Sequence, residues 1–483
     1  MRGPAITTDL HDSGSEPEYH DLSILEQIPF HSNTQICLCF PVADASSGSH
    51  AAIIHTLTNG LERLSASFPW LAGKVVRVHE GSDPGSSGIL KIQPLKPEIP
   101  RLIVKDLRDD TSMPKMDALR RADFPMRMLD ENIIAPRKTF FHESASDPDP
   151  APVFLIQANF ITGGLLLTFD SHHNAMDKSG QYQVMRLFSK ACRGEQFTSD
   201  ELSSGNLPRR DLIPLLDDAY SYTPDSELVR RIAVRAPSAP SCPTDASPPP
   251  KCTWAYFTFP PTALAALKSR ATETLTLPSA AAGYISTDDA LTAFIWQSTT
   301  RVRLPRLHSD PTAAPASTLA RAVNVRRYLG IPQTYPGAAV NMTYHTYAPQ
   351  TLVGAPLGGI AAGLRAAVDP KTADLGHRTR ALATMLHRTP DKDTVGFIAA
   401  LDLSADVMVS SWAQVGCLGL DFGLGLGEAE AARRPRFQEA EGLVYLMPRA
   451  VGGEGVVAVC LREEEMQRLR EDAEFGEYAR YVG

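Results

Sequence analysis

The sequence predicts a mixed α/β protein of two similar-sized domains, and two observations carry that prediction. In both halves of the 483-residue chain, short apolar runs typical of strands stand beside longer segments with helical spacing. Between the halves lies APSAPSCPTDASPPPKC at 236–252, too rich in proline, serine and alanine for a regular element. We therefore expect a disordered leader at 1–20, a domain at 21–235, a linker at 236–252 and a domain at 253–483. A pocket between two such halves is a natural place for a ligand.

Composition and charge favour a globular protein that binds neither nucleic acid nor a membrane. Hydrophobic residues make up 43% and charged residues 21% of the chain, as in ordinary globular domains. The net charge of −8 gives no basic footprint, and no apolar run approaches the roughly 20 residues that span a bilayer. The N-terminus lacks the apolar core of a signal peptide, and the seven cysteines are scattered. We therefore expect reduced thiols and a cytoplasmic location.

The first half alternates between strand and helix patterns after the segment DLSILEQ at 21–27. Apolar runs bounded by turn residues predict strands, and apolar positions at i, i+3 and i+4 predict helices. The expected elements are a strand at 35–40, a helix at 51–64, strands at 153–160 and 165–169 joined by Thr162-Gly163-Gly164, and a helix at 181–192.

The second half repeats this mixture of elements. A helix is expected at 287–301, with Ser286 or Thr287 as its N-cap. Strands are expected near Val323, near Val340, at 407–409, and as a pair at 443–447 and 456–461, and the chain ends in a charged amphipathic helix from Arg462 onward, expected to present a solvated face.

The polar cluster at the end of strand 165–169 is the strongest candidate for a catalytic site. In the run FDSHHNAMDKSG, the apolar strand ends in His172 and His173, and Asp177 follows His173 four positions later. A histidine at a strand end is held rigidly yet can meet a substrate. Such a group suits a base that takes a proton from an alcohol or amine while it attacks an acyl carbonyl. Asp177 falls near the start of the next helix, where the helix dipole favours a carboxylate.

Two other interpretations of this cluster stay open. An isolated H-x-x-x-D also arises as a satisfied core histidine followed by a helix-capping aspartate. His172, His173 and Asp177 are also metal-ligand types, but no further Cys/His cluster completes a set, and we expect no metal. The signatures of serine hydrolases, P-loop proteins and dinucleotide-binding proteins are absent from the sequence.

A second motif, far downstream, connects this cluster to a known family. Ser410-Ser411-Trp412 is followed by DFGLG at 421–425. H-x-x-x-D in mid-chain with D-F-G-x-G near the C-terminus resembles the BAHD acyltransferases, and within them the fungal branch that includes trichothecene 3-O-acetyltransferase. Weaker resemblances follow in family order at LSILEQ (22–27), FPWLAGK (68–74), the helix at 286–296, and Asn324-Val325-Arg326 before Tyr335-Pro336-Gly337.

The resemblance implies two chloramphenicol-acetyltransferase-like α/β domains with a central channel between them. It implies that His173 is the general base, and that Asp177 is structural and pairs with an arginine, for which Arg326 is the candidate. A loop that shapes the CoA channel without touching the reacting atoms is implied at Asp421, Phe422, Gly423 and Gly425.

The resulting prediction is an acyl-CoA-dependent O-acyltransferase, in the first instance an acetyltransferase, acting on a hydroxyl of a fungal secondary metabolite. The partners implied are acetyl-CoA or another acyl-CoA and a small-molecule alcohol, with no permanently bound cofactor, and the protein is expected to be a monomer. Two alternatives remain. One is a condensation-like enzyme that uses a carrier-protein thioester, since His172-His173 also fits H-H-x-x-x-D. The other is a catalytically silent relative that acts as a binding protein.

The chain departs from the family pattern at two positions. Leu424 stands where D-F-G-W-G has tryptophan. Ala338 stands where an asparagine is expected after Gly337, and Asn341 is the nearest substitute. The second change bears on the chemistry, because the tetrahedral intermediate needs hydrogen-bond donors and this segment lacks the expected amide.

Overall fold

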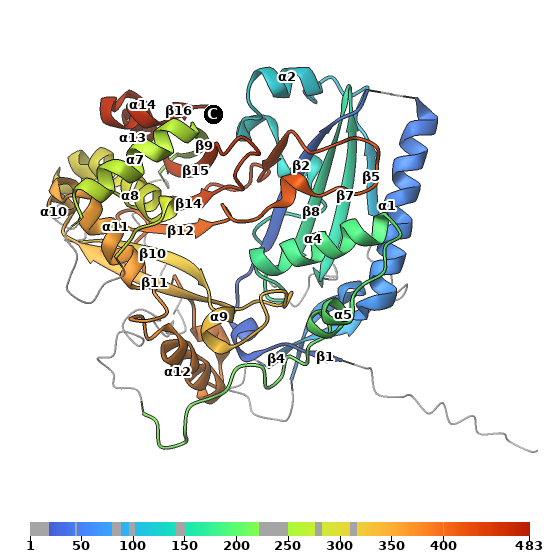
Figure 1. Ribbon diagram of the computed structural model, residues 1–483, viewed down its shortest axis with the longest axis horizontal. Helices are drawn as coiled ribbons and strands as arrows, with labels where there is room; N and C mark the ends of the chain where they lie inside the picture. The colour runs from blue at the N-terminus through green and yellow to red at the C-terminus, as the bar shows by residue number, and fades with distance from the viewer. Residues whose placement is uncertain are drawn as a thin grey trace, which may run out of the picture.

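Two halves, each built of strands and helices, lie side by side in the computed structural model (Figure 1). It describes residues 19–43, 46–79, 88–95, 102–141, 151–221, 250–275, 283–309, 316–398 and 400–483. The predicted leader up to residue 18, and residues 236–249 of the predicted linker, lie outside the described residues. The mixed α/β architecture is confirmed, because strands and helices alternate through both halves.

The main sheet of the first half is centred on two strands that are buried almost throughout. β2 (Asn33–Pro41) and β8 (Gly164–His172) pair antiparallel over their full length, with Asn33 opposite His172. Helices α1 (Ser47–Ser67) and α4 (Lys178–Cys192) pack on one face of this sheet (Figure 1). The strand order is β13 (Ala431–Arg433), β2, β8, β7 (Phe154–Ile161) and β5 (Leu102–Asp106).

The hairpin predicted around residues 162–164 is present between β7 and β8. The two strands are antiparallel, with Ile161 opposite Gly164. Gly163 occupies the turn with a φ of 79°, a left-handed conformation that glycine adopts without steric cost. From this turn β8 runs back through the sheet and ends at His172, directly before His173.

A smaller sheet and several short helices complete the first half. The sheet has the order β1 (His20–Asp21), β4 (Ile89–Pro94), β3 (Gly73–Val78) and β6 (Ala151–Pro152). The short helices are α2 (Met116–Arg121), α3 (Glu131–Ile134) and α5 (Ser199–Gly205), with 3₁₀ turns at Ile24–Gln27, Pro69–Ala72 and Met126–Met128.

The second half is organised on a seven-stranded sheet. Its order is β11 (Val340–Tyr347), β10 (Ser317–Asn324), β12 (Val407–Ser411), β14 (Leu443–Leu446), β15 (Gly455–Arg462), β9 (Cys252–Phe259) and β16 (Arg480–Tyr481). Its helices are α7 (Pro261–Glu273), α8 (Thr287–Ser309), α9 (Arg326–Leu329), α10 (Pro349–Gly354), α11 (Leu357–Ala366), α12 (Leu375–Arg388), α13 (Glu463–Glu471) and α14 (Ala473–Tyr478), with 3₁₀ turns at Lys392–Thr394 and Cys417–Gly419.

One strand of the second half belongs to the sheet of the first. β13 pairs antiparallel with β2, placing Ala431 opposite Cys39 and Arg433 opposite Cys37 (Figure 1). The chain therefore crosses from the second half into the first after residue 411 and returns at β14, where residue 443 re-enters the large sheet. This crossing carries the DFGLG segment into contact with the first half.

Several predicted elements are longer or shorter than their sequence pattern suggested. α4 begins at Lys178 rather than residue 181, and α8 continues through Pro305 to Ser309. The prediction of a single helix from Arg462 onward is wrong, because two helices are present. Asp472 ends α13 and caps α14, its carboxylate accepting a hydrogen bond from Phe475 N. The description of this segment as a solvated face is also incomplete, since Leu469 and Phe475 are buried in the core of the second half.

Within the described residues, no helix is long and apolar enough to cross a membrane. The six cysteines described are all free thiols, and Cys242 lies outside the described residues.

Candidate active site

His173 stands directly after the last residue of β8, at the end of the hairpin that presents it. Its backbone N–H donates to the carbonyl of Ser32 at 3.1 Å, which ties it to the start of β2. His172 faces the other way: it is buried, and its ring lies 5.5 Å from that of Phe141. The alternation of a strand therefore separates the two histidines. The charges of Asp177 and Lys178, at the start of α4, act on His173.

The imidazole of His173 is held by stacking. Its ring lies 4.2 Å from the ring of Phe30 with an interplanar angle of 16°, and Phe30 also contacts Phe397. Nδ1 is buried and makes no hydrogen bond to any described residue. The side chain as a whole is only partly buried, so Nε2 is the nitrogen that can meet a substrate.

The surroundings of His173 keep its imidazole neutral. Burial lowers the pKa of His173 to about 4, and the positive charges of Arg434 and Lys178 act in the same direction. The His173 backbone carbonyl and the Asp177 carboxylate oppose this effect only partly. The ring is therefore an unprotonated acceptor at neutral pH, as a general base must be.

Asp177 caps α4 and forms a buried ion pair with Arg326. Its Oδ1 accepts from Gly180 N at 2.7 Å, so the carboxylate satisfies the first turn of the helix. Arg326 donates to Oδ2 at 2.8 Å and to Oδ1 at 3.0 Å, and Ala339 N adds a bond to Oδ2 at 2.9 Å. The structure thus brings together the two residues for which the resemblance implied a pair.

The remaining donors of Arg326 hold a loop of the second half. Nε donates to the carbonyl of Tyr335 at 3.0 Å, and Nη2 to the carbonyl of Gly337 at 2.5 Å. Since Arg326 lies in the second half and Asp177 in the first, this network fixes the two halves together beside His173. Both the capping interpretation of Asp177 and its ion-pair interpretation hold at once.

The segment after Gly337, where the family pattern has an asparagine, makes other hydrogen bonds in this chain. Ala338 N donates to the buried carboxylate of Glu26 at 2.8 Å. Asn341 donates to Thr379 Oγ1 on α12 at 3.0 Å, and its carbonyl oxygen accepts from Met342 N. Asn341 is therefore engaged with α12 and does not join the contacts of Asp177.

The DFGLG segment packs against the far end of α4 rather than next to His173. The Asp421 carbonyl accepts from Ser189 Oγ at 2.6 Å and from Arg193, while its carboxylate accepts from Gly423 N at 2.8 Å. Phe422 is buried, and its ring contacts the rings of Phe40, Phe169 and Phe188.

The glycines of this segment are conformationally required. Gly423 and Gly425 have φ values of 68° and 69°, which disfavour any residue with a side chain. Leu424, in the place of the family tryptophan, is half-buried against the same core as Phe422. The segment thus shapes a loop around Phe422, which anchors it to the first half.

Sequence reasoning missed three side chains near His173. Phe30 stacks on its ring, and the charges of Lys178 and Arg434 reach it. Lys178 directly follows Asp177 in the sequence, which was a possible signal. Arg434 follows the crossing strand β13, and nothing in its local sequence, RRPR, indicates that it returns to the histidine.

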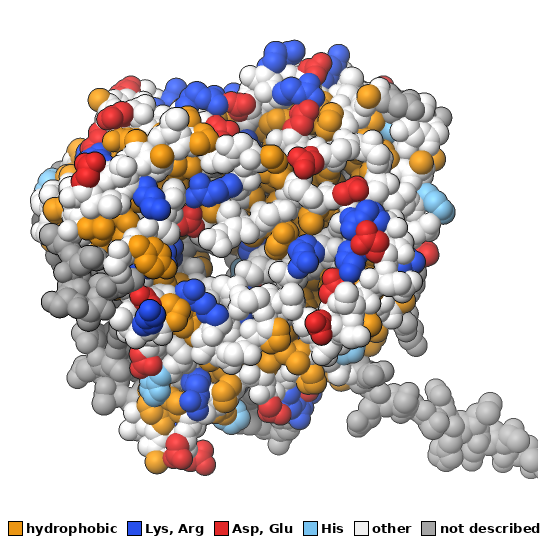
Figure 2. All heavy atoms as spheres, viewed as in Figure 1, with side chains coloured by type: hydrophobic (Ala, Val, Ile, Leu, Met, Phe, Trp, Pro, Cys, Tyr) orange, Lys and Arg blue, Asp and Glu red, His pale blue; other side chains and the backbone are white. Residues whose placement is uncertain are grey.

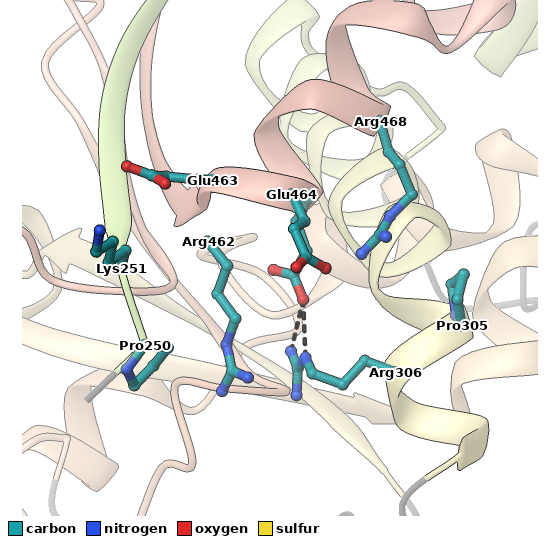
Figure 3. A pocket seen from close by; sticks show the side chains of 9 residues that line it. Pro250, Lys251, Pro305, Arg306, Arg462, Glu463, Glu464 and Arg468 are labelled. Carbon is teal, nitrogen blue, oxygen red and sulfur yellow. Dashed lines mark hydrogen bonds and ion pairs between the residues drawn. The ribbon is translucent and has the colours of Figure 1, made fainter. Parts of the chain in front are cut away.

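The candidate site is separate from a cavity of about 580 Å³ in the second half. Figure 3 shows this cavity between the start of β9, the end of α8 and the start of α13. Two of its charged side chains, Arg306 and Glu465, form an ion pair. It contains none of the predicted site residues. Among the described residues, no three His, Cys, Asp or Glu side chains gather closely enough to hold a metal ion.

The face of the molecule shown in Figure 2 is hollowed near its centre, where the two halves meet. Lys and Arg side chains lie around this region together with acidic ones, so this face has no extended area of one charge sign.

Two family models match the chain. One, described as the trichothecene 3-O-acetyltransferase-like N-terminal domain, covers residues 33–192, and the other, the transferase family, covers residues 129–476. Similar proteins include O-acetyltransferase dmxR13 of a Cryptosporiopsis species, with 54% identity over 96% of this chain and 97% of that protein. Trichothecene 3-O-acetyltransferase TRI101 of Fusarium sporotrichioides is 47% identical over 96% of this chain and 97% of its own length.

Solved structures agree with these similarities. TRI101 of F. sporotrichioides, in complex with coenzyme A and T-2, matches with a TM-score of 0.85 and 45% identity over 96% of this chain and all of that one. TRI101 of F. graminearum, in complex with ethyl coenzyme A, matches with a TM-score of 0.87 and 43% identity over 96% of this chain and all of that one. A nonribosomal peptide synthetase shares only the fold, at 16% identity. The chain therefore belongs to the BAHD transferase family, with the two-domain α/β fold of the trichothecene 3-O-acetyltransferases.

Proposed function

We propose that this protein is an acetyl-CoA-dependent O-acetyltransferase that acts on a hydroxyl group of a fungal secondary metabolite. The observation that carries the proposal is His173, a neutral histidine at a strand end whose loop is fixed by the buried Asp177–Arg326 pair. The similar proteins named above are O-acetyltransferases, and solved structures of TRI101 hold coenzyme A together with T-2 or deoxynivalenol. Acetyl-CoA is thus a co-substrate of the proposed reaction, not a resident cofactor.

His173 acts as the general base in this reaction. Nε2 takes the proton of the acceptor hydroxyl as its oxygen forms a bond to the thioester carbonyl carbon. When the C–S bond of the tetrahedral intermediate breaks, the imidazolium returns the proton to the departing thiolate. Base catalysis of this kind contributes roughly 10²–10⁴-fold, and the positioning of both substrates at one site contributes much of the rest.

Asp177 and Arg326 position the base without taking part in proton transfer. Both carboxylate oxygens of Asp177 are occupied by Arg326, by the first turn of α4 and by Ala339 N. The DFGLG loop, including Asp421, Phe422, Gly423 and Gly425, supports the opposite end of α4. We assign it a structural role beside the CoA path.

The proposal is tested by measuring thiol release from acetyl-CoA with a panel of hydroxylated terpenoids and polyketides, for the wild type and for His173→Ala. We expect acceptor-dependent release in the wild type and its loss in the variant. Equal release in both proteins would remove His173 from the mechanism. Turnover only with an acyl group on a carrier protein would favour the condensation-like alternative.

Three further expectations complete the proposal. The protein works as a monomer in the cytoplasm, which size-exclusion chromatography and cell fractionation test directly. The segment 236–252 links two domains, at 21–235 and 253–483, and limited proteolysis should cut there first.

A further inference from the structure

Arg434 is a buried cation that forms no ion pair with any carboxylate among the described residues. It is 3% exposed, and its guanidinium lies 4.3 Å from the ring of Phe437, 4.7 Å from that of Tyr445 and 5.4 Å from that of Trp412. Within the described part of the chain its side chain makes one hydrogen bond, a long one of 3.5 Å to Thr139 Oγ1, and Nε has no partner there. The charges of Glu131 and Asp170 reach Arg434, but Asp170 is paired with Arg137 and Glu131 accepts from Thr139 N. A guanidinium offers five donors, and a buried charge is costly unless paired, so Arg434 has donors left for a bound anion.

The backbone of Arg434 is fixed in place. The Tyr256 hydroxyl accepts from Arg434 N at 2.8 Å and donates to Arg434 O at 2.9 Å. The side chain therefore projects from a rigid point directly after β13, on the face of the sheet that α4 covers, since β13 places its neighbour Arg433 on the opposite face with Cys37.

Lys178 is a second buried cation against the same aromatic ring. It is 9% exposed, and its Nζ lies 3.8 Å from the centre of the Trp412 ring. Its only hydrogen bond is to Gln181 Oε1 at 2.5 Å, and it forms no ion pair within the described part of the chain. Burial and the charge of Arg434 lower its pKa well below the usual range, an effect that a bound anion reverses.

Both cations lie within electrostatic reach of the proposed base. Their charges act on His173, and Lys178 begins the helix whose positive dipole end points toward the same region. An anion held here is therefore at the reaction centre. The phosphates of CoA do not fit this role, because they are separated from its sulfur by the whole pantetheine arm.

We propose that Lys178 and Arg434, both held against Trp412, form a subsite for an anionic oxygen of the reacting substrates beside His173. This rests on the proposed function. One source of such an oxygen is the thioester carbonyl: as the hydroxyl oxygen bonds to the carbonyl carbon, the C=O electron pair moves onto this oxygen, and it returns when the C–S bond breaks. The other source is an anionic group of the acceptor itself.

The test compares Lys178→Met and Arg434→Met with the wild type and with Arg433→Met. Arg433 is a matched control because it is an adjacent, buried arginine that donates to the backbone carbonyls of Phe124 and Asp123. Steady-state kinetics with acetyl-CoA and acceptor would be recorded across pH, after circular dichroism has verified folding. If Arg434→Met does not fold, the same kinetic comparison is made with Arg434→Lys, which keeps the charge.

Both Met variants are expected to lower kcat by about 10²- to 10³-fold, the usual loss when one oxyanion donor is removed, with KM for acetyl-CoA unchanged. The acid limb of kcat/KM should move to higher pH, because fewer positive charges then face His173. The other charged or titratable groups acting there, His172 and Asp177, are unaltered. Arg434→Lys should recover part of the activity.

The kinetic constant that changes identifies the source of the oxygen. A fall in kcat alone assigns it to the thioester carbonyl, and a rise in the acceptor KM assigns it to the acceptor. If folded variants match Arg433→Met in both constants and in pH profile, the subsite is refuted. A wild type that shows no acetyl-CoA-dependent turnover would instead refute the proposed function.

Discussion

At the scale of single residues, His173, the proposed base, lies in surroundings that disfavour a protonated imidazole. Burial and two nearby cations hold its pKa near 4, well below that of a free imidazole. A base of this kind is weak, but it is fully available at neutral pH. Its conjugate acid is correspondingly strong, which favours return of the proton to the thiolate.

The low pKa of His173 predicts the pH dependence of the reaction. Since the proposed mechanism requires the neutral ring, kcat/KM should stay level as the pH falls from 7 and should decline only near pH 4. The measurement is a pH profile of kcat/KM with the protein verified as folded at each pH. A limb near pH 6.5, the ordinary histidine value, would show that substrate-free His173 is solvated rather than buried.

Phe30 is expected to set the orientation of the imidazole. Phe30→Leu keeps the site apolar but removes the ring stacked 4.2 Å from His173. Aromatic pairs contribute about 0.5–1.5 kcal/mol, so kcat should fall by about 2- to 10-fold with little change in stability. Phe141→Leu, which removes a ring beside His172 instead, is the control and should leave kcat unchanged.

At the scale of elements, α4 is fixed at both ends by residues distant in sequence. Asp177 and Arg326 hold its first turn, and the Asp421 carbonyl holds Ser189 and Arg193 in its last turns. The helix therefore connects the region of His173 to the DFGLG loop as a support fixed at both ends.

Breaking the pair at the start of α4 should destabilise the whole protein. Asp177→Asn still caps the helix but leaves Arg326 buried without a counter-charge, at an expected cost of about 3–5 kcal/mol. Asp130→Asn is the matched control, since Asp130 also caps a helix and pairs with an arginine, Arg436, but at the surface. It should cost about 0–1 kcal/mol. Urea unfolding measures both, and equal costs would contradict a structural role for Asp177.

The first turn of α4 also lies too close to the second half to accept a methyl group. A Cβ on Gly180 would stand 1.9 Å from the Pro336 carbonyl oxygen, so Gly180→Ala must displace that loop. We expect a loss of about 1–3 kcal/mol and reduced activity. Gly363→Ala in α11 meets nothing closer than 4.0 Å and should be neutral or stabilising. Thermal unfolding of the two variants makes the comparison.

Local patterns in the sequence were sufficient to predict the strands that position His173. The apolar run that became β8 ends in polar residues, and the β7–β8 hairpin needs glycine at its turn, so the position of His173 could be predicted. The Asp177–Arg326 pair came from resemblance, since no local signal joins residues 149 positions apart. Phe30 and Arg434 could not be predicted, because a tertiary contact and a strand crossing bring them to the site.

At the scale of the whole molecule, the two halves are joined by more than a linker. β13 completes the sheet of the first half, and Arg326 binds across the boundary. We expect one cooperative unfolding transition, with intrinsic fluorescence and circular dichroism giving the same midpoint. Two separated transitions would show that the halves are independent despite these contacts.

The crossing strand also has a consequence for how the protein is made. A ribosome releases β2, β7 and β8 long before residues 431–433 exist, so the first half leaves the exit tunnel with one edge of its sheet uncovered. An uncovered edge strand is prone to pair with other chains. Nascent chains of this protein should therefore depend on chaperones until β13 has been translated, when about nine-tenths of the sequence is complete.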